Sequence, residues 1–203
     1  MNNKSEYSQD DQFLIERILN GDTNAFSIII KNTEGLVAQI IFKMIPNKED
    51  RKDIAQEVYL KAFRNLKNFR FQSKLSTWIG QISYNACFNF LEKKKPILPD
   101  NLQGEDESYE EPLEKLSNRF DSYNNQTEMN IYQKELSEIL RAGLENLPPV
   151  YKTLITLFHN EELSYAEIGQ ITDLPEGTIK NYLFRARKAL RDNILLTYNK
   201  EAL

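Results

Sequence analysis

The sequence predicts an all-α protein: two small helical domains joined by a flexible acidic linker, the C-terminal domain containing a helix-turn-helix. Apolar residues recur at helical spacing, and no sustained alternation of apolar and polar residues marks a strand. From Pro96 to Glu128 the chain is rich in acids, prolines and asparagines, a composition that buries little apolar surface. We therefore expect domains at residues 1–95 and 130–203, with the linker at residues 96–129.

Helical periodicity and capping residues define the expected elements. Asp22 and Asn47 lie where N-caps are expected, and the prolines of "NLPPVY", residues 146–151, end one helix and begin another. The first six helices are expected at about Asp11–Leu19, Asn24–Ile45, Lys48–Leu66, Ser76–Lys94, Ile131–Leu144 and Pro149–Phe158.

The stretch "LSYAEIGQITDLPEGTIKNYLFRARKAL", residues 163–190, is typical of two helices around a tight turn. Ser164 and Glu167 have capping-box spacing, so a short helix should run from about Ser164 to Ile171. Pro175 suits the first turn of a second helix, which should end near Leu195.

The second helix has an apolar stripe and a polar face. Ile179, Leu183, Ala186 and Leu190 form the stripe, which must be buried. Amide, guanidinium and ammonium groups on the other side suit base edges and phosphates of duplex DNA, whereas the alternative is a solvated cationic face. The candidate DNA-contacting residues are Thr178, Lys180, Asn181, Phe184, Arg185 and Lys188.

The N-terminal domain combines aromatic and cationic residues between Phe69 and Lys95, a pattern that suits single-stranded nucleic acid. Packing is the alternative for individual residues, above all for Trp78, which has helix-core spacing. Phe71, in an expected loop, is harder to explain by burial.

On the preceding helix, Ile54, Val58 and Leu66 fit an inward stripe. A polar and mostly acidic surface lies at the front of that helix, formed by Asp50, Asp53, Gln56 and Glu57.

Composition argues against several other classes of protein. The net charge of -4 arises largely from the linker, while residues 13–95 are basic. One cysteine and one histidine allow neither a disulfide within the chain nor a Cys/His metal cluster, which fits a reducing cytoplasm. We find no signal peptide, no apolar run long enough to cross a bilayer and no catalytic motif, so we expect neither cofactor nor enzymatic activity. His159 and Cys87 are interpreted as structural residues.

Two segments together resemble a known family. The combination of "EDRKDIAQEVYLKAFRNLKNFR...STWIGQISYNACFNFLEKKK" with "LENLPPVYKTLITLFHNEELSYAEIGQITDLPEGTIKNYLFRARKAL" looks like the extracytoplasmic-function (ECF) group of bacterial RNA polymerase sigma-70 factors. The resemblance covers about Phe13–Lys95 and Glu135–Leu195. It departs from the family pattern after "TW", where Ile79, Gly80 and Gln81 replace the usual leucine, aromatic residue and arginine. This departure affects the expected details of how the -10 promoter element is recognised.

The resemblance implies three sites and three partners. The partners are core RNA polymerase, promoter DNA and an anti-sigma factor, and the linker would thread the polymerase's RNA-exit path. The acidic surface would bind the largest polymerase subunit, and the second helix of the helix-turn-helix would contact the duplex -35 element through the residues given above. The loop from Phe71 to Leu75 would capture a base flipped from the non-template strand of the -10 element, at a cost of a few kcal/mol. The -10 candidates are Phe71, Gln72, Ser73, Lys74, Trp78, Gln81 and Tyr84.

Two other classes of function stay open. A helix-turn-helix repressor would need a dimer to contact two half-sites, and this sequence offers no obvious dimerisation helix. A protein-only sigma mimic would bind polymerase or an anti-sigma factor without selecting a promoter.

Overall fold

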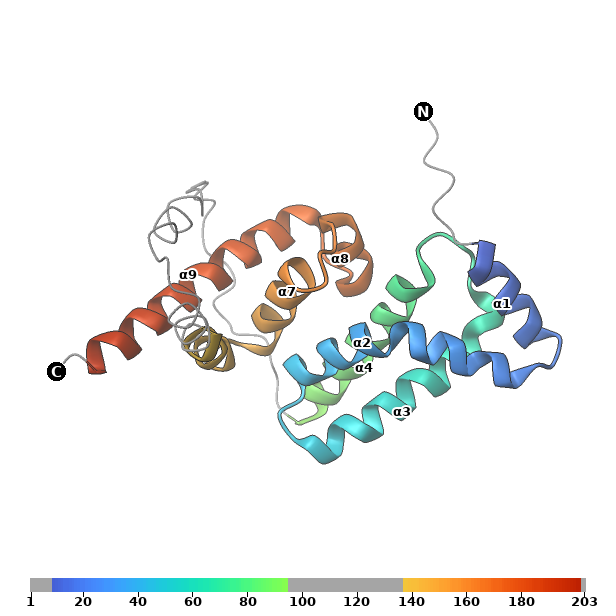
Figure 1. Cartoon of the computed structure of the whole chain (residues 1–203). Helices are drawn as coiled ribbons and strands as arrows, with labels where there is room; N and C mark the ends of the chain where they lie inside the picture. Colours follow the sequence, from blue (N-terminus) through green and yellow to red (C-terminus); the bar gives the residue numbers. More distant parts are fainter. Residues whose placement is uncertain (1–8, 95–136, 202–203) are drawn as a thin grey trace, which may run out of the picture.

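The computed structural model describes residues 9–94 and 137–201, and over these ranges the chain contains helices and turns but no strand (Figure 1). The N-terminal half comprises α1 (Gln9–Leu19), η1 (Thr23–Ala25), α2 (Phe26–Met44), α3 (Lys48–Asn65), η2 (Leu66–Asn68) and α4 (Leu75–Lys94). The C-terminal half comprises a helix at residues 137–145 followed by α7 (Pro149–His159), α8 (Tyr165–Thr172) and α9 (Glu176–Glu201). The predicted all-helical fold is confirmed.

The helix ends follow the capping residues that the sequence predicts. Asp22 accepts a hydrogen bond from the backbone N–H of Ala25, and Asn47 accepts one from Glu49 at 3.0 Å. At the end of α2, the Arg51 guanidinium donates to the carbonyl of Ile45 at 2.6 Å, which satisfies a carbonyl that lacks a helical partner. The predicted helix at Ile131–Leu144 falls partly outside the described residues, and the predicted linker at residues 96–129 falls wholly outside them.

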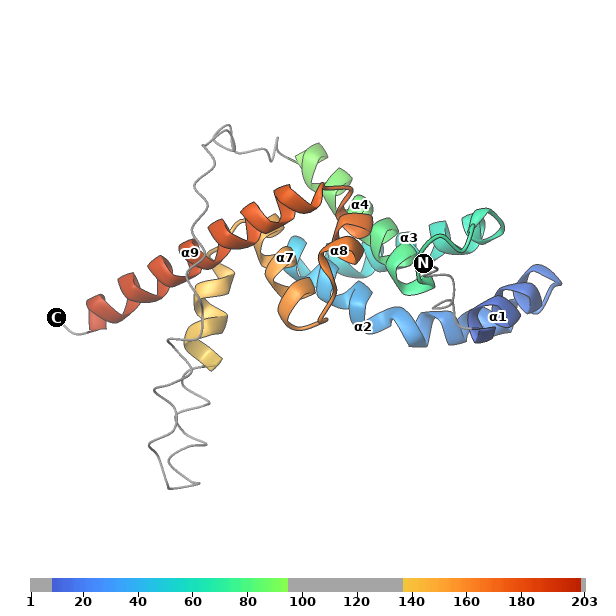
Figure 2. The ribbon, with the colours of Figure 1, turned by 90° about the horizontal axis from the view of Figure 1, so that it is seen from above.

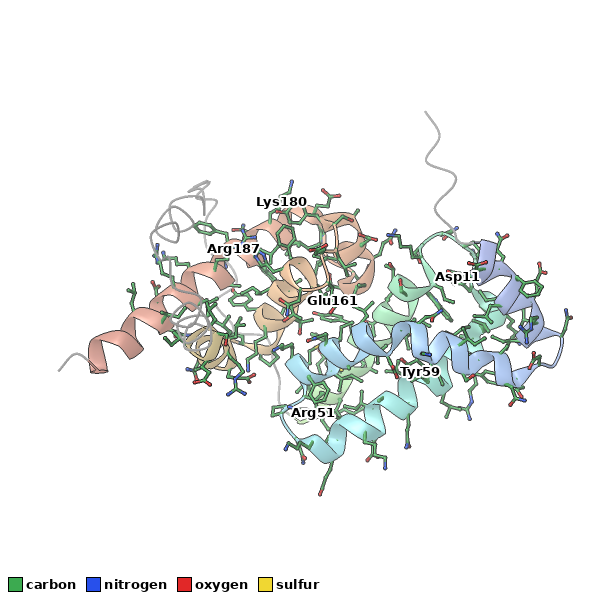
Figure 3. The ribbon with its side chains drawn as sticks, viewed as in Figure 1. Asp11, Arg51, Tyr59, Glu161, Lys180 and Arg187 are labelled. Atoms are coloured by element: carbon green, nitrogen blue, oxygen red, sulfur yellow. The ribbon has the colours of Figure 1, made fainter. Side chains whose placement is uncertain are left out.

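The N-terminal helices pack around α2 and α4. Helix α2 contacts both α3 and α4, and its buried side chains include Ile29, Val37 and Ile40. From α3, Ile54 and Val58 face this core as predicted, and Leu66 of η2 joins them. Tyr59 of α3 contacts α2, where its hydroxyl oxygen is 3.2 Å from that of Thr33 (Figure 3).

One apolar segment corrects an expectation. Residues Thr23–Met44 are long and apolar enough to cross a membrane by length and composition, so the expectation that no such run exists was wrong on that criterion. The same segment is the central core helix of this half of the chain and contacts α3, α4 and α7. Packing within the protein therefore accounts for its apolar character.

The two halves of the chain lie against each other. Helix α8 packs on α4 and helix α7 packs on α2, as the two perpendicular views show (Figures 1 and 2). Helix α9 begins beside α8 and extends away from the N-terminal helices (Figure 2). The first helix of the helix-turn-helix is thus docked on the helix that carries three of the -10 candidates, Trp78, Gln81 and Tyr84.

The capping box of α8 gives a test of the local fold. The Ser164 hydroxyl accepts from the N–H of Glu167, while the Glu167 carboxylate accepts from the N–H of Ser164 at 3.0 Å. Ser164→Ala should lower the free energy of unfolding by about 1 kcal/mol in urea denaturation, because a helix-start N–H loses its partner. Ser164→Thr keeps the hydroxyl that accepts this hydrogen bond and should cost less. Equal losses for the two variants would contradict the capping account.

Candidate nucleic-acid interface

Local backbone geometry determines the turn between α8 and α9. Asp173 ends α8 in the left-handed region, with φ of 58°, and its N–H donates to the carbonyl of Gly169 at 2.8 Å. A Cβ on Gly169 would lie 3.1 Å from the carbonyl oxygen of Leu174, so the absence of a side chain allows the tight reversal. The turn sets the angle at which α9 leaves α8.

The predicted apolar stripe of α9 is buried over most of its length. Ile179, Leu183 and Ala186 are fully buried, and Leu190 is half-buried. Next to Leu190, a Cβ on Gly143 would lie 2.9 Å from the Leu190 Cδ1 atom, so the helix at residues 137–145 packs closely there. This burial fixes the rotation of α9 and therefore which residues face outward.

The outward face of α9 carries the six predicted DNA contacts. Lys180, Phe184 and Lys188 are exposed, whereas Thr178, Asn181 and Arg185 are half-buried. The Lys180 ammonium lies 5.3 Å from the centre of the Tyr165 ring, which links it to α8 (Figure 3). Phe184 exposes 37% of its surface, so part of its ring is open to contact from outside the chain. The face therefore presents amide, hydroxyl, cationic and aromatic groups together.

Arg187 belongs to a different environment from those six residues. Its guanidinium lies 5.4 Å from the centre of the Phe158 ring, and its Nη2 atom is 3.3 Å from Nε2 of His159 (Figure 3). Its Nε atom is buried and has no hydrogen-bond partner among the described residues. Arg187 thus joins α9 to α7, a role that its sequence spacing on the flank of α9 did not reveal.

The loop before α4 holds four of the -10 candidates. Phe71 has a left-handed backbone, with φ of 54°, which is uncommon for an aromatic residue. Its ring is 4.8 Å from that of Phe69, which in turn lies 5.2 Å from the ring of Trp78. The ring of Phe71 therefore packs against buried Phe69, a contact that the sequence did not predict. Gln72 and Lys74 are exposed, and Ser73 is half-buried.

The remaining -10 candidates lie along α4 and differ in exposure. Trp78 and Gln81 are half-buried, but Tyr84 retains only 5% of its surface. Burial, together with the nearby Tyr182 of α9 and Cys87, raises the pKa of Tyr84 to about 12. In this arrangement the phenol of Tyr84 is covered and does not face solvent.

The polar surface of α3 lies beside an apolar groove. Asp53, Gln56 and Glu57 are exposed on one face of the helix, and Asp50 is half-buried. Exposed Leu60 and Phe63 follow on the same helix. The groove, of about 500 Å³, is lined by Phe26, Ile30, Ala55, Tyr59, Leu60 and Phe63 together with Lys52 and Gln56. Sequence analysis missed the groove; its only sign was that Leu60 and Phe63 lie off the inward stripe of α3.

The described residues offer little that suits other site chemistry. No group of three or more His, Cys, Asp or Glu side chains within those ranges could hold a metal ion. Burial raises the pKa of Cys87 to about 12, which keeps its thiol protonated near neutral pH.

Comparison with known proteins connects both halves to one family. Residues 29–97 match the model for Sigma-70 region 2, and residues 137–190 match that for Sigma-70, region 4. Similar proteins include the ECF RNA polymerase sigma-E factors of Haemophilus influenzae and Escherichia coli strain K12, each 33% identical to this chain. The alignments cover 91% of this chain and 95% and 94% of those relatives, respectively.

Two solved structures share the fold. CnrH in complex with the cytosolic domain of CnrY aligns with a TM-score of 0.59 at 18% identity, over 93% of this chain and 97% of that chain. The sigma factor RpoE in complex with the anti-sigma factor NepR, from Bartonella quintana, aligns with a TM-score of 0.56 at 20% identity. That second alignment covers 83% of this chain and 96% of the other.

The contact between Arg187 and the only histidine of the chain predicts a pH effect on stability. Burial and the Arg187 charge lower the pKa of His159 below 6.5, so the folded chain binds this proton less readily than the unfolded chain. The free energy of unfolding should therefore decrease as the pH falls below about 6.5. In urea denaturation, His159→Gln should flatten this slope. An unchanged slope in the variant would contradict the assignment.

Proposed function

Because this chain belongs to the extracytoplasmic-function subfamily of the bacterial sigma-70 factors, we propose that its two halves divide the work of promoter recognition. The chain is an alternative RNA polymerase sigma factor that recognises promoters. Residues 1–95 would bind core polymerase and open the -10 element, residues 96–129 would connect the halves, and residues 130–203 would bind the -35 element.

The outward face of α9 carries the proposal for the -35 element. It presents Lys180, Phe184 and Lys188 to solvent, on a helix whose other side is fixed by a buried stripe. A helix of this kind fits the major groove, where Asn and Arg can form paired hydrogen bonds with adenine and guanine. Asn181 and Arg185 would contact bases, Phe184 suits a thymine methyl group, and Thr178, Lys180 and Lys188 would bind the backbone or nearby bases.

The loop around Phe71 supports the proposal for the -10 element. Exposed Gln72 and Lys74 flank half-buried Ser73 and follow Phe71, whose ring packs against Phe69 in the same cluster as Trp78. A cation for the phosphate and aromatic faces for stacking are what a single strand requires. The left-handed Phe71 is a strained position of the kind found at binding sites. Gln81 and Tyr84 would extend the path along α4.

The surface of α3 supports the proposal for core polymerase. Asp50, Asp53, Gln56 and Glu57 supply the polar part of this surface. The neighbouring groove, with Leu60 and Phe63 exposed, supplies apolar area of the kind that the centre of a protein interface buries. We propose that both parts form one polymerase-binding surface.

The partners and location follow from the family. Sigma factors are transcription initiation factors without enzymatic activity, and we expect neither a cofactor nor an enzymatic reaction for this chain. One structural neighbour was solved with an anti-sigma factor, and we propose that this chain also has such a partner. It would act in the cytoplasm, where core polymerase and promoter DNA are found.

Alanine substitutions on α9 test the proposal for the -35 element. Arg185→Ala should cost about 1–3 kcal/mol in promoter binding by the holoenzyme and relax one base preference. Lys188→Ala should weaken binding to all promoters similarly. It should also reduce the slope of the logarithm of the binding constant against the logarithm of the salt concentration by about one. The measurements are transcription from promoter templates and DNA binding as a function of salt.

Two controls accompany this test. Lys31→Ala removes an exposed cation from α2. It should change neither transcription from the promoter templates nor the salt dependence of DNA binding. Affinity for core polymerase and the melting temperature should be the same in all three variants. If Arg185→Ala and Lys188→Ala lost core binding as well, the division of labour would be unsupported.

The groove gives a second test with a matched control. Leu60→Ala should weaken binding of the chain to core polymerase by about 1–2 kcal/mol, because an apolar contact at the interface centre is lost. Ile28→Ala on α2 removes an aliphatic side chain of similar exposure, 44% against 49% for Leu60, outside the groove. Equal affinities of the two variants in a fluorescence titration with core polymerase would exclude the groove from the interface.

A further inference from the structure

A small cavity lies where α1, α2 and the start of α4 meet. Its volume is about 180 Å³, and it lies beside the turn of α1 that approaches the loop leading into α4, where Asp11 is found (Figure 3). A water molecule takes about 30 Å³ in the liquid, so the cavity has room for about six waters or for one nucleobase. The lining residues differ from the -10 candidates given above and are Asp11, Ile29, Asn32, Thr33, Leu75 and Ser76.

Asp11 contributes a carboxylate whose burial is not compensated. The first turn of α1 contains both Asp10 and Asp11, but Asp10 is exposed, whereas Asp11 is half-buried and lines the cavity. The helix dipole favours acids in a first turn, but it does not require that one of them face a cavity. Burial and, after it, the charge of Asp10 raise the pKa of Asp11, and no cation or hydrogen-bond donor among the described residues opposes this effect. A ligand with an N–H group would supply the missing partner.

The other lining residues suit the faces and the edge of a base. Ile29 and Leu75 are buried and offer apolar surface against which a ring can pack. Asn32 is exposed and Ser76 is half-buried, and both side chains can donate hydrogen bonds. The cavity thus combines a group that only accepts, Asp11, with two groups that can donate. Cytosine, adenine and guanine carry an amino group that can donate to a carboxylate, whereas thymine carries carbonyl oxygens and a methyl group instead.

The cavity lies directly beyond the loop that is proposed to bind the -10 strand. Ser76 follows Lys74 by two residues, so their Cα atoms are at most about 7 Å apart. A strand held at Lys74 therefore brings its neighbouring nucleotide within reach of the cavity. An unpaired base that leaves the stack exposes its Watson–Crick edge, which a pocket can contact by hydrogen bonds.

We propose that this cavity is a second base pocket, which takes one unpaired nucleotide of the promoter strand beside the -10 loop and selects bases with an amino group through Asp11. The inference deepens the proposed function and rests on it, because a base can enter only after the strand has opened. Asp11 accepts a hydrogen bond from the amino group, while Asn32 and Ser76 donate to acceptor atoms of the base. Thymine would place a carbonyl oxygen against the carboxylate and is therefore disfavoured.

Selection from a randomised strand tests the pocket. Holoenzyme assembled from core polymerase and the full-length chain is bound to forked DNA, which carries the -35 duplex of a mapped promoter and a randomised single strand beginning at the -10 element. Sequencing of the bound DNA gives the base preference at each position. Wild-type holoenzyme should disfavour thymine about tenfold against the best base at one position beside that contacted by the loop. Asp11→Asn should remove this discrimination, because an amide can also donate to a carbonyl oxygen, and should leave the other positions unchanged.

Two further variants accompany Asp11→Asn. Glu16→Gln removes an exposed carboxylate from the same helix, outside the cavity, and should keep the wild-type preference at every position. Asn32→Leu places an apolar side chain in the cavity and should abolish selection at the position that Asp11→Asn affects. Melting temperatures check that the variants are folded. Because Asp11 and Asn32 lie on different helices, either variant tests the pocket if the other does not fold.

The outcomes separate the pocket from the proposed function. Identical base preferences of wild type and folded Asp11→Asn, or an equal change in Glu16→Gln, would overturn the pocket alone. Weaker binding of Asp11→Asn to core polymerase with unchanged base preferences would also overturn it and would indicate that the cavity holds a cationic side chain of the polymerase. An absence of promoter-specific transcripts, or of any base preference in wild-type holoenzyme, would overturn the proposed function and the pocket with it.

Discussion

Burial of α4 on two sides is the constraint on which the rest of the structure depends. One side of this helix packs against α2 and α3, and another receives α8. Ile79 belongs to the buried core, while Gly80 provides the close approach for α8. Because the loop at Phe71 leads directly into α4, the same packing fixes the aromatic cluster at its start. Every surface assigned to DNA or polymerase is positioned directly or indirectly by this helix.

The three candidate surfaces consequently differ in accessibility. The outward face of α9 and the polar face of α3 are open to solvent, whereas the -10 surface is partly covered at Tyr84. Recognition of duplex DNA needs only side chains on a fixed helix. Strand opening also requires a pocket that replaces base stacking. The face of α9 is therefore available in this arrangement, whereas part of the proposed -10 surface is covered.

Local features were predictable from the sequence, and long-range packing was not. Asp22, Asn47 and Ser164 act on backbone groups two or three residues away, so residue type and spacing were sufficient. The burial of Tyr84 and the contact of Gly80 with Ile171 depend on segments about 90 residues apart, which periodicity cannot locate. The same holds for the groove, where α2 and α3 contribute together. The family resemblance supplied the functions of the surfaces, but the structure supplied their exposure.

The most direct test of the account is to add the purified chain to core RNA polymerase with fragments of its host's genomic DNA and to map the transcripts. The account predicts discrete start sites that share upstream -35 and -10 sequences, lost when the face of α9 is altered. Core polymerase that stays silent, while the chain alone binds duplex DNA as a dimer, would contradict it and indicate a repressor.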